Sequence, residues 1–281
     1  MSNLVIITGS NGYVAKSVLN KLSGTDITVV QVSSSPTSSQ VSVEELCEIC
    51  EEIERTNWSI TLIHTAGNAH NLRRLNYDLV ADYLNFTFNV FSAVEHYARV
   101  DVIFLSSIAI YGQVSAKEEL TNRSLIRPNS LYGLEKIFVE NLICDKAKSK
   151  KITYSILRLP MIYGKYAKGN PMKILKALEK GVPLPFKKVS KNRRSVLDID
   201  LLVDTIISRI HSVRKTNLIT FLKDEKPLST KEIIQKIGEI HGLQPKFFVL
   251  NWHVLWLCIY MFLGRSGCES LLGNLIIEDR G

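Results

Sequence analysis

The stretch LVIITGSNGYVA at residues 4–15 decides the fold of this chain. Its apolar run meets Gly9 and Gly12, and the residues that follow have helical spacing, which predicts a strand, a glycine turn and a helix in that order. Free backbone N–H groups and the helix dipole favour a pyrophosphate at the start of that helix. Ala15 is still small enough for the helix to pack closely on the strand. The stretch therefore predicts a dinucleotide-binding βαβ unit.

The same alternation of strand and helix continues through the first 160 residues. The predicted strands are residues 27–32, 60–64, 102–105 and 154–159, and the predicted helices are residues 43–54, 79–99 and 130–147. Short apolar runs between amphipathic helices are typical of a parallel sheet that is covered on both faces. We therefore expect an α/β fold, with a Rossmann-type doubly wound parallel sheet over residues 1–160.

The rhythm changes after Pro160, where further prolines interrupt short helices. We expect helices at 199–212 and 229–240, and a smaller region over 161–281 that mainly binds substrate. The segment 247–263, FFVLNWHVLWLCIYMFL, is strongly apolar but falls short of the roughly 20 residues that span a bilayer. It is either a helix on the membrane surface, which gives a peripheral membrane contact, or a helix that packs against the core or a partner.

The net charge of +8 admits a nucleic-acid partner, an anionic membrane or a polyanionic small ligand. The basic runs at 146–151 and 187–194 carry neither an aromatic-interleaved RNA motif nor a helix-turn-helix, so we expect no nucleic-acid partner. Cys47 and Cys50 lie in an acidic helix without a second ligand pair, so we expect no metal. Residues 1–10 lack the pattern of a signal peptide, which predicts a cytoplasmic location.

The end of the second predicted strand bears on the choice of cofactor. Dinucleotide sites usually place Asp or Glu there, on the adenosine ribose, but this strand ends in Val32, Ser33 and Ser34. Nothing there repels a 2′-phosphate, and serine hydroxyls such as that of Ser33 can donate to one. The sequence leaves both NAD and NADP open.

Three residues form a candidate catalytic group. Tyr132 and Lys136 are four apart on one predicted helix, so they share a helix face. A phenol has a pKa near 10, and we expect the neighbouring ammonium to lower it, which suits Tyr132 to proton transfer. Ser107 follows the strand at 102–105, at the edge where open α/β sheets bind ligands, and its hydroxyl can hold the reacting oxygen.

With these residues in place, the chain resembles the extended short-chain dehydrogenase/reductase superfamily, in its NAD-dependent epimerase/dehydratase branch. The resemblance covers almost the whole chain. It rests on TGSNGYVA (8–15), LIHTAG (62–67), DYLNFTFNVF (82–91), FLSSIAIYG (104–112), YGLEK (132–136), LRLPMIYG (157–164) and NRRSVLDIDLLVD (192–204). It departs from the usual pattern at Ala15, at the missing carboxylate after the second strand, and at Gly281, where relatives usually continue through another helix.

The resemblance implies a role for each site residue. Ser107, Tyr132 and Lys136 are the catalytic residues it implies, and Lys136 also reaches the nicotinamide ribose. The cofactor-binding residues it implies are Gly9, Asn11, Gly12, Tyr13, Val14, Ser33, Ala66, Gly67 and Asn85. Arg194 is the implied ligand of a substrate diphosphate, which suits a guanidinium fork, and Asn170 is a second substrate contact.

The resemblance also implies an activity. The motif forms are most similar to bacterial enzymes of surface-polysaccharide synthesis, O-antigen or capsule, that act at C4 of a UDP-N-acetyl sugar as 4-epimerases or 4-keto reductases. The missing ribose carboxylate favours the reductase slightly. An alternative of another class is a sensor or scaffold protein that binds dinucleotide without catalysis. We expect a homodimer through the helices at 79–99 and 130–147.

Overall fold

The computed structural model describes residues 3–54, 58–67, 77–97, 99–149, 152–213 and 215–279. The chain forms two compact units. Unit 1 contains Met1–Gly112, Ile126–Arg158 and Leu202–Thr220, and unit 2 contains Gln113–Leu125, Leu159–Leu201 and Phe221–Gly281. The chain enters unit 2 three times, at Gln113, Leu159 and Phe221, and returns to unit 1 at Ile126 and Leu202, whereas we expected one boundary after residue 160.

Unit 1 is built on a six-stranded sheet in the order β2-β1-β3-β4-β6-β9. Its strands are β1 (Asn3–Thr8), β2 (Thr28–Val32), β3 (Ser59–His64), β4 (Val100–Ser107), β6 (Ile152–Leu159) and β9 (Leu218–Phe221). β1 pairs in parallel with β2 on one side and with β3 on the other, and β3 pairs in parallel with β4. The strand order therefore reverses beside β1, and ligands of doubly wound sheets bind outside the carboxyl ends of the strands at such a point.

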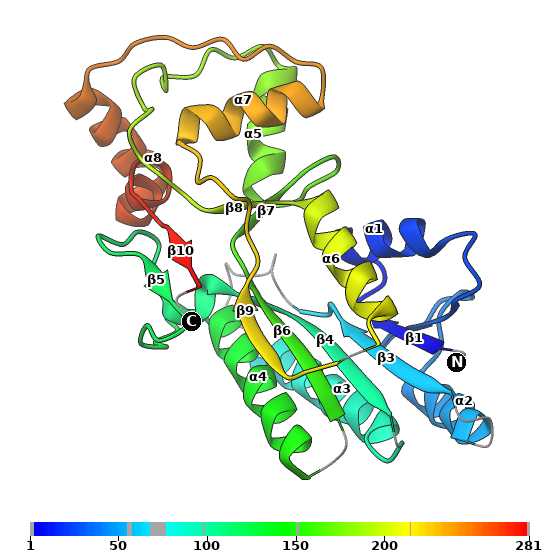
Figure 1. The fold of residues 1–281 in the computed structure, drawn as a ribbon. Helices are drawn as coiled ribbons and strands as arrows, with labels where there is room; N and C mark the ends of the chain where they lie inside the picture. The colour runs from blue at the N-terminus through cyan, green and yellow to red at the C-terminus, as the bar shows by residue number, and fades with distance from the viewer. Residues whose placement is uncertain are drawn as a thin grey trace. The chain divides into compact units, whose positions relative to one another are not determined.

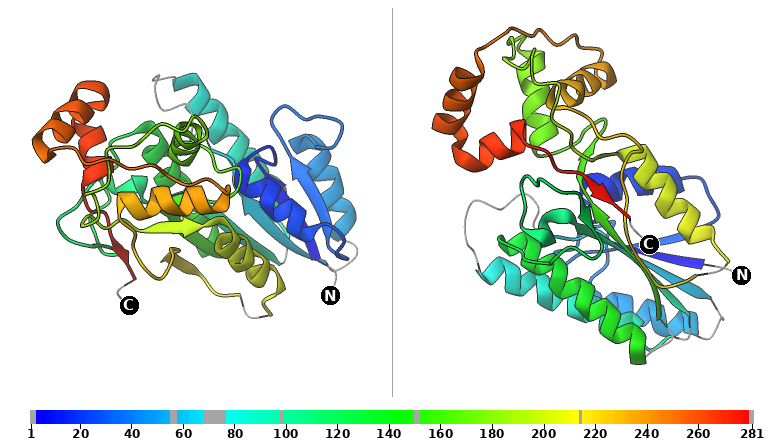
Figure 2. Two further views of the ribbon diagram at one scale, coloured as in Figure 1. Left: turned by 90° about the horizontal axis from the view of Figure 1, so that it is seen from above. Right: turned by 60° about the vertical axis from the view of Figure 1, so that its left-hand side comes forward.

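Helices cover both faces of this sheet, as the doubly wound fold requires. They are α1 (Tyr13–Leu22), α2 (Val43–Glu54), α3 (Tyr77–Val94), α4 (Leu131–Ser149) and α6 (Ile199–His211). Figure 1 shows α1 and α6 on one face and α2, α3 and α4 on the other, and the right-hand view of Figure 2 shows the same arrangement. The predicted fold class is confirmed.

The sheet supplies the core of unit 1 because its strands are apolar on both faces. β1 and β3 are buried at every position after the first. Leu4, Leu62 and Phe104 pack in one cluster with Phe91 of α3 and Ile143 of α4. The continuous apolar runs that predicted buried parallel strands thus form the centre of the unit.

One helix prediction in unit 1 is wrong at its end. We expected a helix over 79–99, whereas α3 ends at Val94 and residues 95 and 96 form a turn. The apolar face of α3 also ends there, since Phe91 and Val94 are buried and His96 is largely exposed. With no further core to cover, the chain turns back towards β4.

Unit 2 consists of three helices and two small sheets. Its elements are β5 (Leu120–Thr121), β7 (Met161–Tyr163), α5 (Asn170–Glu179), β8 (Val196–Asp198), α7 (Thr230–Ile240), α8 (Trp252–Leu272) and β10 (Ile277–Glu278). β5 pairs with β10 and β7 pairs with β8, both in parallel. Leu175 and Leu178 of α5 pack with Ile233, Ile234 and Ile237 of α7 in the core of this unit.

The apolar segment 247–263 is helical only from Trp252. The side chain of Asn251 accepts a hydrogen bond from the backbone N–H of His253 and so caps α8, as asparagine commonly does. The backbone N–H of Phe248 donates to the carbonyl of Leu184, and the N–H of Leu184 donates to the carbonyl of Lys246, so this part of the segment forms a strand-like pairing before the helix begins. No helix among the described residues is long and apolar enough to cross a membrane.

Candidate active site

The glycine turn after β1 has the shape that a dinucleotide phosphate needs. Gly9 has a φ of +67°, and a Cβ at this position would lie 2.8 Å from the backbone N and Cα of Ala66. Gly12 donates its N–H to the Gly9 carbonyl at 2.8 Å and then begins α1, which no side chain of the described residues caps. The first-turn N–H groups of α1 therefore point out of the start of the helix, the arrangement by which helix N-termini bind anions.

A buried histidine joins β1, β3 and α3 behind this turn. The Nδ1 atom of His64 lies 2.8 Å from Oγ1 of Thr8, and its Nε2 atom lies 3.2 Å from Oγ1 of Thr87 and 3.3 Å from the hydroxyl of Tyr83. Burial, and to a lesser extent the charge of Lys136, lowers the pKa of His64 to about 3. His64 is therefore neutral and fixes the end of β3, although sequence reasoning did not single it out.

The three predicted catalytic residues come together at the carboxyl edge of the sheet. Ser107 ends β4 and Tyr132 lies in the first turn of α4, and the Ser107 side chain lies close enough to the Tyr132 phenol to act on its pKa, which it lowers. The Lys136 Nζ atom lies 5.5 Å from the centre of the Tyr132 ring and donates to the Ala66 carbonyl at 3.3 Å. Lys136 thus stands between the proposed proton-transfer group and the loop after β3.

The electrostatics of this group differ from the sequence-based expectation. We expected the ammonium to lower the pKa of Tyr132, but burial, with a smaller contribution from the Glu135 carboxylate, raises that pKa to about 12. Burial also lowers the pKa of Lys136 to about 8, against the opposing effect of the nearby Glu135 and Glu140 carboxylates. Both groups are pushed towards their neutral forms, so the phenol is protonated in the resting site.

A glycine in the first turn of α4 sets the position of Tyr132. A Cβ on Gly133 would lie 2.7 Å from the carbonyl oxygen of Ala109 and 3.0 Å from Cβ of Pro128. Ala109 belongs to the short 3₁₀ helix η1 (Ile108–Tyr111). The backbone N–H of Ala109 donates to the hydroxyl of Ser107. Gly133 therefore lets α4 approach η1 closely enough for Tyr132 to reach Ser107.

A buried ion pair holds the middle of α4 on the sheet. Arg158 of β6 donates to both carboxylate oxygens of Glu140, with Nη2 2.7 Å from Oε2 and Nε 3.1 Å from Oε1. Its Nη1 atom donates to the hydroxyl of Tyr111, and Ser106 donates to Glu140. All polar atoms of this pair thus have partners, which is the condition for a buried ion pair to persist.

The remaining predicted cofactor residues lie in three places. Ala66 and Gly67 follow β3 next to Lys136, since a Cβ on Gly67 would lie 2.9 Å from its Nζ atom. Asn11 is exposed in the glycine turn, and Ser33 follows β2, where its hydroxyl accepts the N–H of Ser35.

Asn85 is not brought into this group. It is exposed on α3, whereas Tyr83 and Thr87 are the residues of that helix that reach His64. Residues two apart on a helix point to different sides, so the Asn85 side chain faces away from those contacts.

The predicted substrate ligands belong to unit 2. The guanidinium of Arg194 donates to the carbonyls of Val114, Glu269 and Gly273 at 3.0 to 3.3 Å. Burial lowers its pKa to about 10, and no carboxylate of the described residues forms an ion pair with it. Asn170 is exposed in the first turn of α5 and accepts a hydrogen bond from Lys173. Arg194 is therefore a positive group without a charged partner in the part of the chain described.

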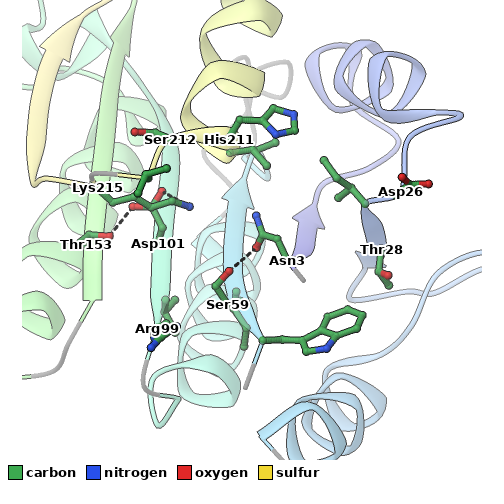
Figure 3. Close-up of a pocket in the computed structure, with 16 residues that line it drawn as sticks. Asn3, Asp26, Thr28, Ser59, Arg99, Asp101, Thr153, His211, Ser212 and Lys215 are labelled. Atoms are coloured by element: carbon green, nitrogen blue, oxygen red, sulfur yellow. Dashed lines mark hydrogen bonds and ion pairs between the residues drawn. The ribbon is translucent and has the colours of Figure 1, made fainter. Parts of the chain in front are cut away.

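A cavity of about 1090 Å³ in unit 1 lies at the other edge of the sheet (Figure 3). Asn3, Ser59 and Asp101 line it, and each stands at the amino end of its strand. The Asp101 carboxylate is bound by Arg209 at 2.6 Å and by Lys215 at 3.5 Å. Because Ser107 lies at the carboxyl end of β4, this cavity is separate from the catalytic group.

The fold and this group of residues define a Rossmann-type dinucleotide-binding protein. Residues 5–216 match the NAD dependent epimerase/dehydratase family, and the chain belongs to that family. It is 24% identical over 251 residues to the UDP-glucose 4-epimerase of Vibrio cholerae, a match that covers 85% of this chain and 76% of the relative. The resemblance seen in the sequence motifs is thereby confirmed.

Solved structures share the same fold. The UDP-N-acetylglucosamine 4-epimerase of Bacillus cereus is 16% identical with a TM-score of 0.70, and the match covers 88% of this chain and 85% of that one. The UDP-glucose 4-epimerase of Thermus thermophilus, solved with NAD, is 18% identical with a TM-score of 0.66. That match covers 96% of this chain and 97% of the other.

NAD, one of the two predicted cofactors, is the cofactor of this family, and the site fits it. Gly9 and Gly12 have no side chains, so a pyrophosphate can come close to the backbone at the start of α1. Lys136, only 3% exposed, lies beside the bare Gly67 at the carboxyl end of β3. These residues would hold the central pyrophosphate and the nicotinamide side of the dinucleotide.

Proposed function

We propose that this chain is an NAD-dependent 4-epimerase of a nucleotide-linked hexose, with a UDP-N-acetyl sugar as its substrate. The observation that carries the proposal is the gathering of Ser107, Tyr132 and Lys136 at the carboxyl edge of the sheet, with the Lys136 Nζ atom 5.5 Å from the centre of the Tyr132 ring. The similar proteins named above are 4-epimerases, so we place a 4-keto reductase second despite the missing carboxylate after β2. A role in surface-polysaccharide synthesis is part of the proposal and rests on the motif forms at 157–164 and 192–204.

The chemistry follows from the proton positions. NAD, when bound, supplies a reversible hydride acceptor. Once its own proton has gone to solvent, Tyr132 acts as a phenolate that takes the proton from the O4 hydroxyl of the sugar and later returns it, while the Ser107 hydroxyl holds that oxygen in place. Because burial keeps the pKa of Tyr132 near 12, proton transfer depends on a positive charge beside the phenolate. The Lys136 ammonium, whose Nζ atom lies 5.5 Å from the centre of the Tyr132 ring, can provide it.

Arg194 supports a diphosphate as the other end of the substrate. A buried guanidinium bonded only to neutral carbonyls keeps its full charge and has no ion-pair partner among the described residues. Phosphate oxygens are acceptors that match a guanidinium fork, so a nucleoside diphosphate would supply the missing negative charge. Asn170 stays a predicted substrate contact.

The alternative function is a dinucleotide-binding sensor or scaffold without catalysis. Such a protein needs the glycine turn and Lys136 but has no use for a phenol placed close to a serine hydroxyl. The placement of Tyr132 beside Ser107 and Lys136 therefore favours the enzyme.

The deciding experiment identifies the bound nucleotide and follows conversion. We expect mass spectrometry of the denatured protein to recover NAD, and NMR to show conversion of UDP-N-acetylglucosamine without added cofactor. Tyr132→Phe should keep NAD and slow conversion by about 100-fold or more, the usual contribution of proton transfer. The control is Tyr154→Phe, a half-buried tyrosine near the amino end of β6, which should leave the rate unchanged.

The other outcomes are distinct. Oxidation of NADPH only when a 4-keto sugar is supplied would replace the epimerase by the reductase. Recovery of NAD with no turnover of either substrate, and no effect of Tyr132→Phe, would favour the sensor.

The predicted homodimer is also a proposal. Phe88 of α3 and Leu134 and Phe138 of α4 are each about half exposed, on the two helices that we expect to form the interface. Exposed large apolar side chains gathered on neighbouring helices mark a surface for a partner. Size measurement of Phe138→Glu, which should shift a dimer towards the monomer, tests this.

A further inference from the structure

The first half of α8 exposes an apolar face that unit 2 does not cover. Only Leu255 and Ile259, one turn apart, are buried in the core of the unit. The exposed apolar and aromatic residues of this face include Trp252, Trp256, Tyr260, Met261, Phe262 and Leu263, and Phe262 is 85% exposed. The helix carries no Asp, Glu, Lys or Arg before Arg265. Soluble monomers rarely leave such a surface in water, so it calls for a covering layer.

The face includes the residue types that favour the boundary between lipid and water. The rings of Trp256 and Tyr260 stack with their centres 5.0 Å apart, and both side chains are nearly half exposed. Trp and Tyr gather at membrane interfaces because their rings are apolar and their N–H and O–H groups remain hydrated. Met261 and Phe262 supply the purely apolar contact.

A basic loop lies directly beside this face. Lys187, Lys188 and Lys191 line one hollow together with Trp252, the first residue of α8. The backbone N–H of Lys187 also bonds to the carbonyl of Phe248, which precedes the helix and is exposed. The three lysines are exposed, and none forms an ion pair with a described residue.

We propose that the apolar face of α8 and the lysines of this basic loop form one surface that docks on anionic membrane lipid. Apolar and aromatic side chains would enter the boundary of the acyl chains while the lysines meet the lipid phosphates. A second copy of the chain is the weaker occupant. Pairing two such faces would bring the lysines of both copies together, and like charges oppose that contact.

The geometry of α8 suits a helix that lies in the plane of the membrane surface. Gly264 has a φ of +68° and interrupts the helix, so the straight part before it is about three turns long. Figure 1 and the right-hand view of Figure 2 show the change of direction within α8. The exposed apolar residues all precede this bend.

Sedimentation of the full chain with vesicles tests the proposal. We expect binding to vesicles of mixed phosphatidylserine and phosphatidylcholine, weakening with salt, and much weaker binding to phosphatidylcholine alone. Changing Lys187, Lys188 and Lys191 to alanine should lower the partition coefficient by about 100-fold, since each basic residue near the surface contributes about fivefold. Phe262→Glu should lower it by at least about tenfold, because a buried Phe contributes that much.

The matched control is Leu125→Glu, which replaces a 76% exposed apolar residue of unit 2 outside α8 and the basic loop. It should bind vesicles like the wild type. The proposal is overturned if the wild type ignores anionic vesicles, or if the lysine and Phe262 variants bind unchanged. It is also overturned if the wild type forms dimers that Phe262→Glu dissociates, because a second copy would then cover the face. The lysine variant alone suffices where Phe262→Glu does not fold.

Discussion

Replacing His64 by glutamine will remove one step in the acid sensitivity of unit 1. His64 is fully buried, and burial lowers its pKa from 6.5 to about 3. The unfolded chain therefore binds a proton at His64 below about pH 6.5, while the folded chain does not until about pH 3. The contribution of His64 to the stability of the folded state is therefore complete above about pH 6.5, and it is lost as the pH falls below that value.

The magnitude follows from the two pKa values. Each unit of pH between them changes the free energy of unfolding by about 1.4 kcal/mol, and the change begins gradually near the upper value. Between about pH 7.5 and pH 5 the wild type should therefore lose about 2 kcal/mol that His64→Gln does not lose. Buried carboxylates add their own pH dependence, but they are common to both proteins and cancel in the difference.

Urea unfolding provides the assay. Both proteins are compared with Trp252 and Trp256 changed to phenylalanine, which leaves Trp58 as the only tryptophan. Trp58 belongs to unit 1, so its fluorescence reports on the unfolding of that unit. His211→Gln is the control, since His211 is exposed at the end of α6 and should leave the wild-type pH dependence intact. The reasoning fails if His64→Gln and the wild type lose stability in parallel, or if the control behaves like His64→Gln.

Three further predictions concern α4. Gly133→Ala should destabilise unit 1 by about 1–3 kcal/mol and slow catalysis more than tenfold, because the Cβ of the new alanine would meet the backbone of Ala109. This cost should exceed the gain from alanine's better helix propensity. Thermal unfolding measures the loss of stability, and kcat measures the loss of activity. The pKa of Lys136 is lowered to about 8 in the folded chain, so between about pH 8 and pH 10 only the unfolded chain keeps the proton on Lys136. Over that range the free energy of unfolding of the wild type should rise by about 2 kcal/mol relative to that of Lys136→Met. A flat difference in urea unfolding over that range would contradict it. Arg158→Met should lower the free energy of unfolding by about 3–5 kcal/mol, because it leaves Glu140 charged and buried without its partner. The double variant Arg158→Met with Glu140→Met should regain most of that stability. A double variant no more stable than Arg158→Met would show that the unpaired Glu140 is not the cause.

Local sequence patterns predicted the sheet of unit 1 and the closeness of Ser107, Tyr132 and Lys136, because both depend on short-range signals. Apolar runs become buried strands wherever helices cover both faces, and the carboxyl ends of parallel strands meet at one edge. That geometry alone brings Ser107 near the start of α4. The spacing of Tyr132 and Lys136 needed only the regularity of a helix.

What the sequence could not predict depends on contacts between distant segments. The contact of Gly133 with Ala109 and the partners of His64 follow from which loops meet, which no local pattern encodes. A glycine inside a helix pattern was the signal that could have pointed to Gly133. The pKa of Tyr132 was predicted in the wrong direction because spacing shows which charge is near but not how deeply the phenol is buried.

The contact between Gly9 and Ala66 also limits how this protein can be redesigned. The turn after β1 and the loop after β3 meet through backbone atoms, so a larger residue at position 9 displaces both segments at once. Directed evolution of cofactor preference will find little freedom there. Ser34 and Ser35 after β2 are exposed, and libraries at these positions can change the preference between NAD and NADP without disturbing the two loops.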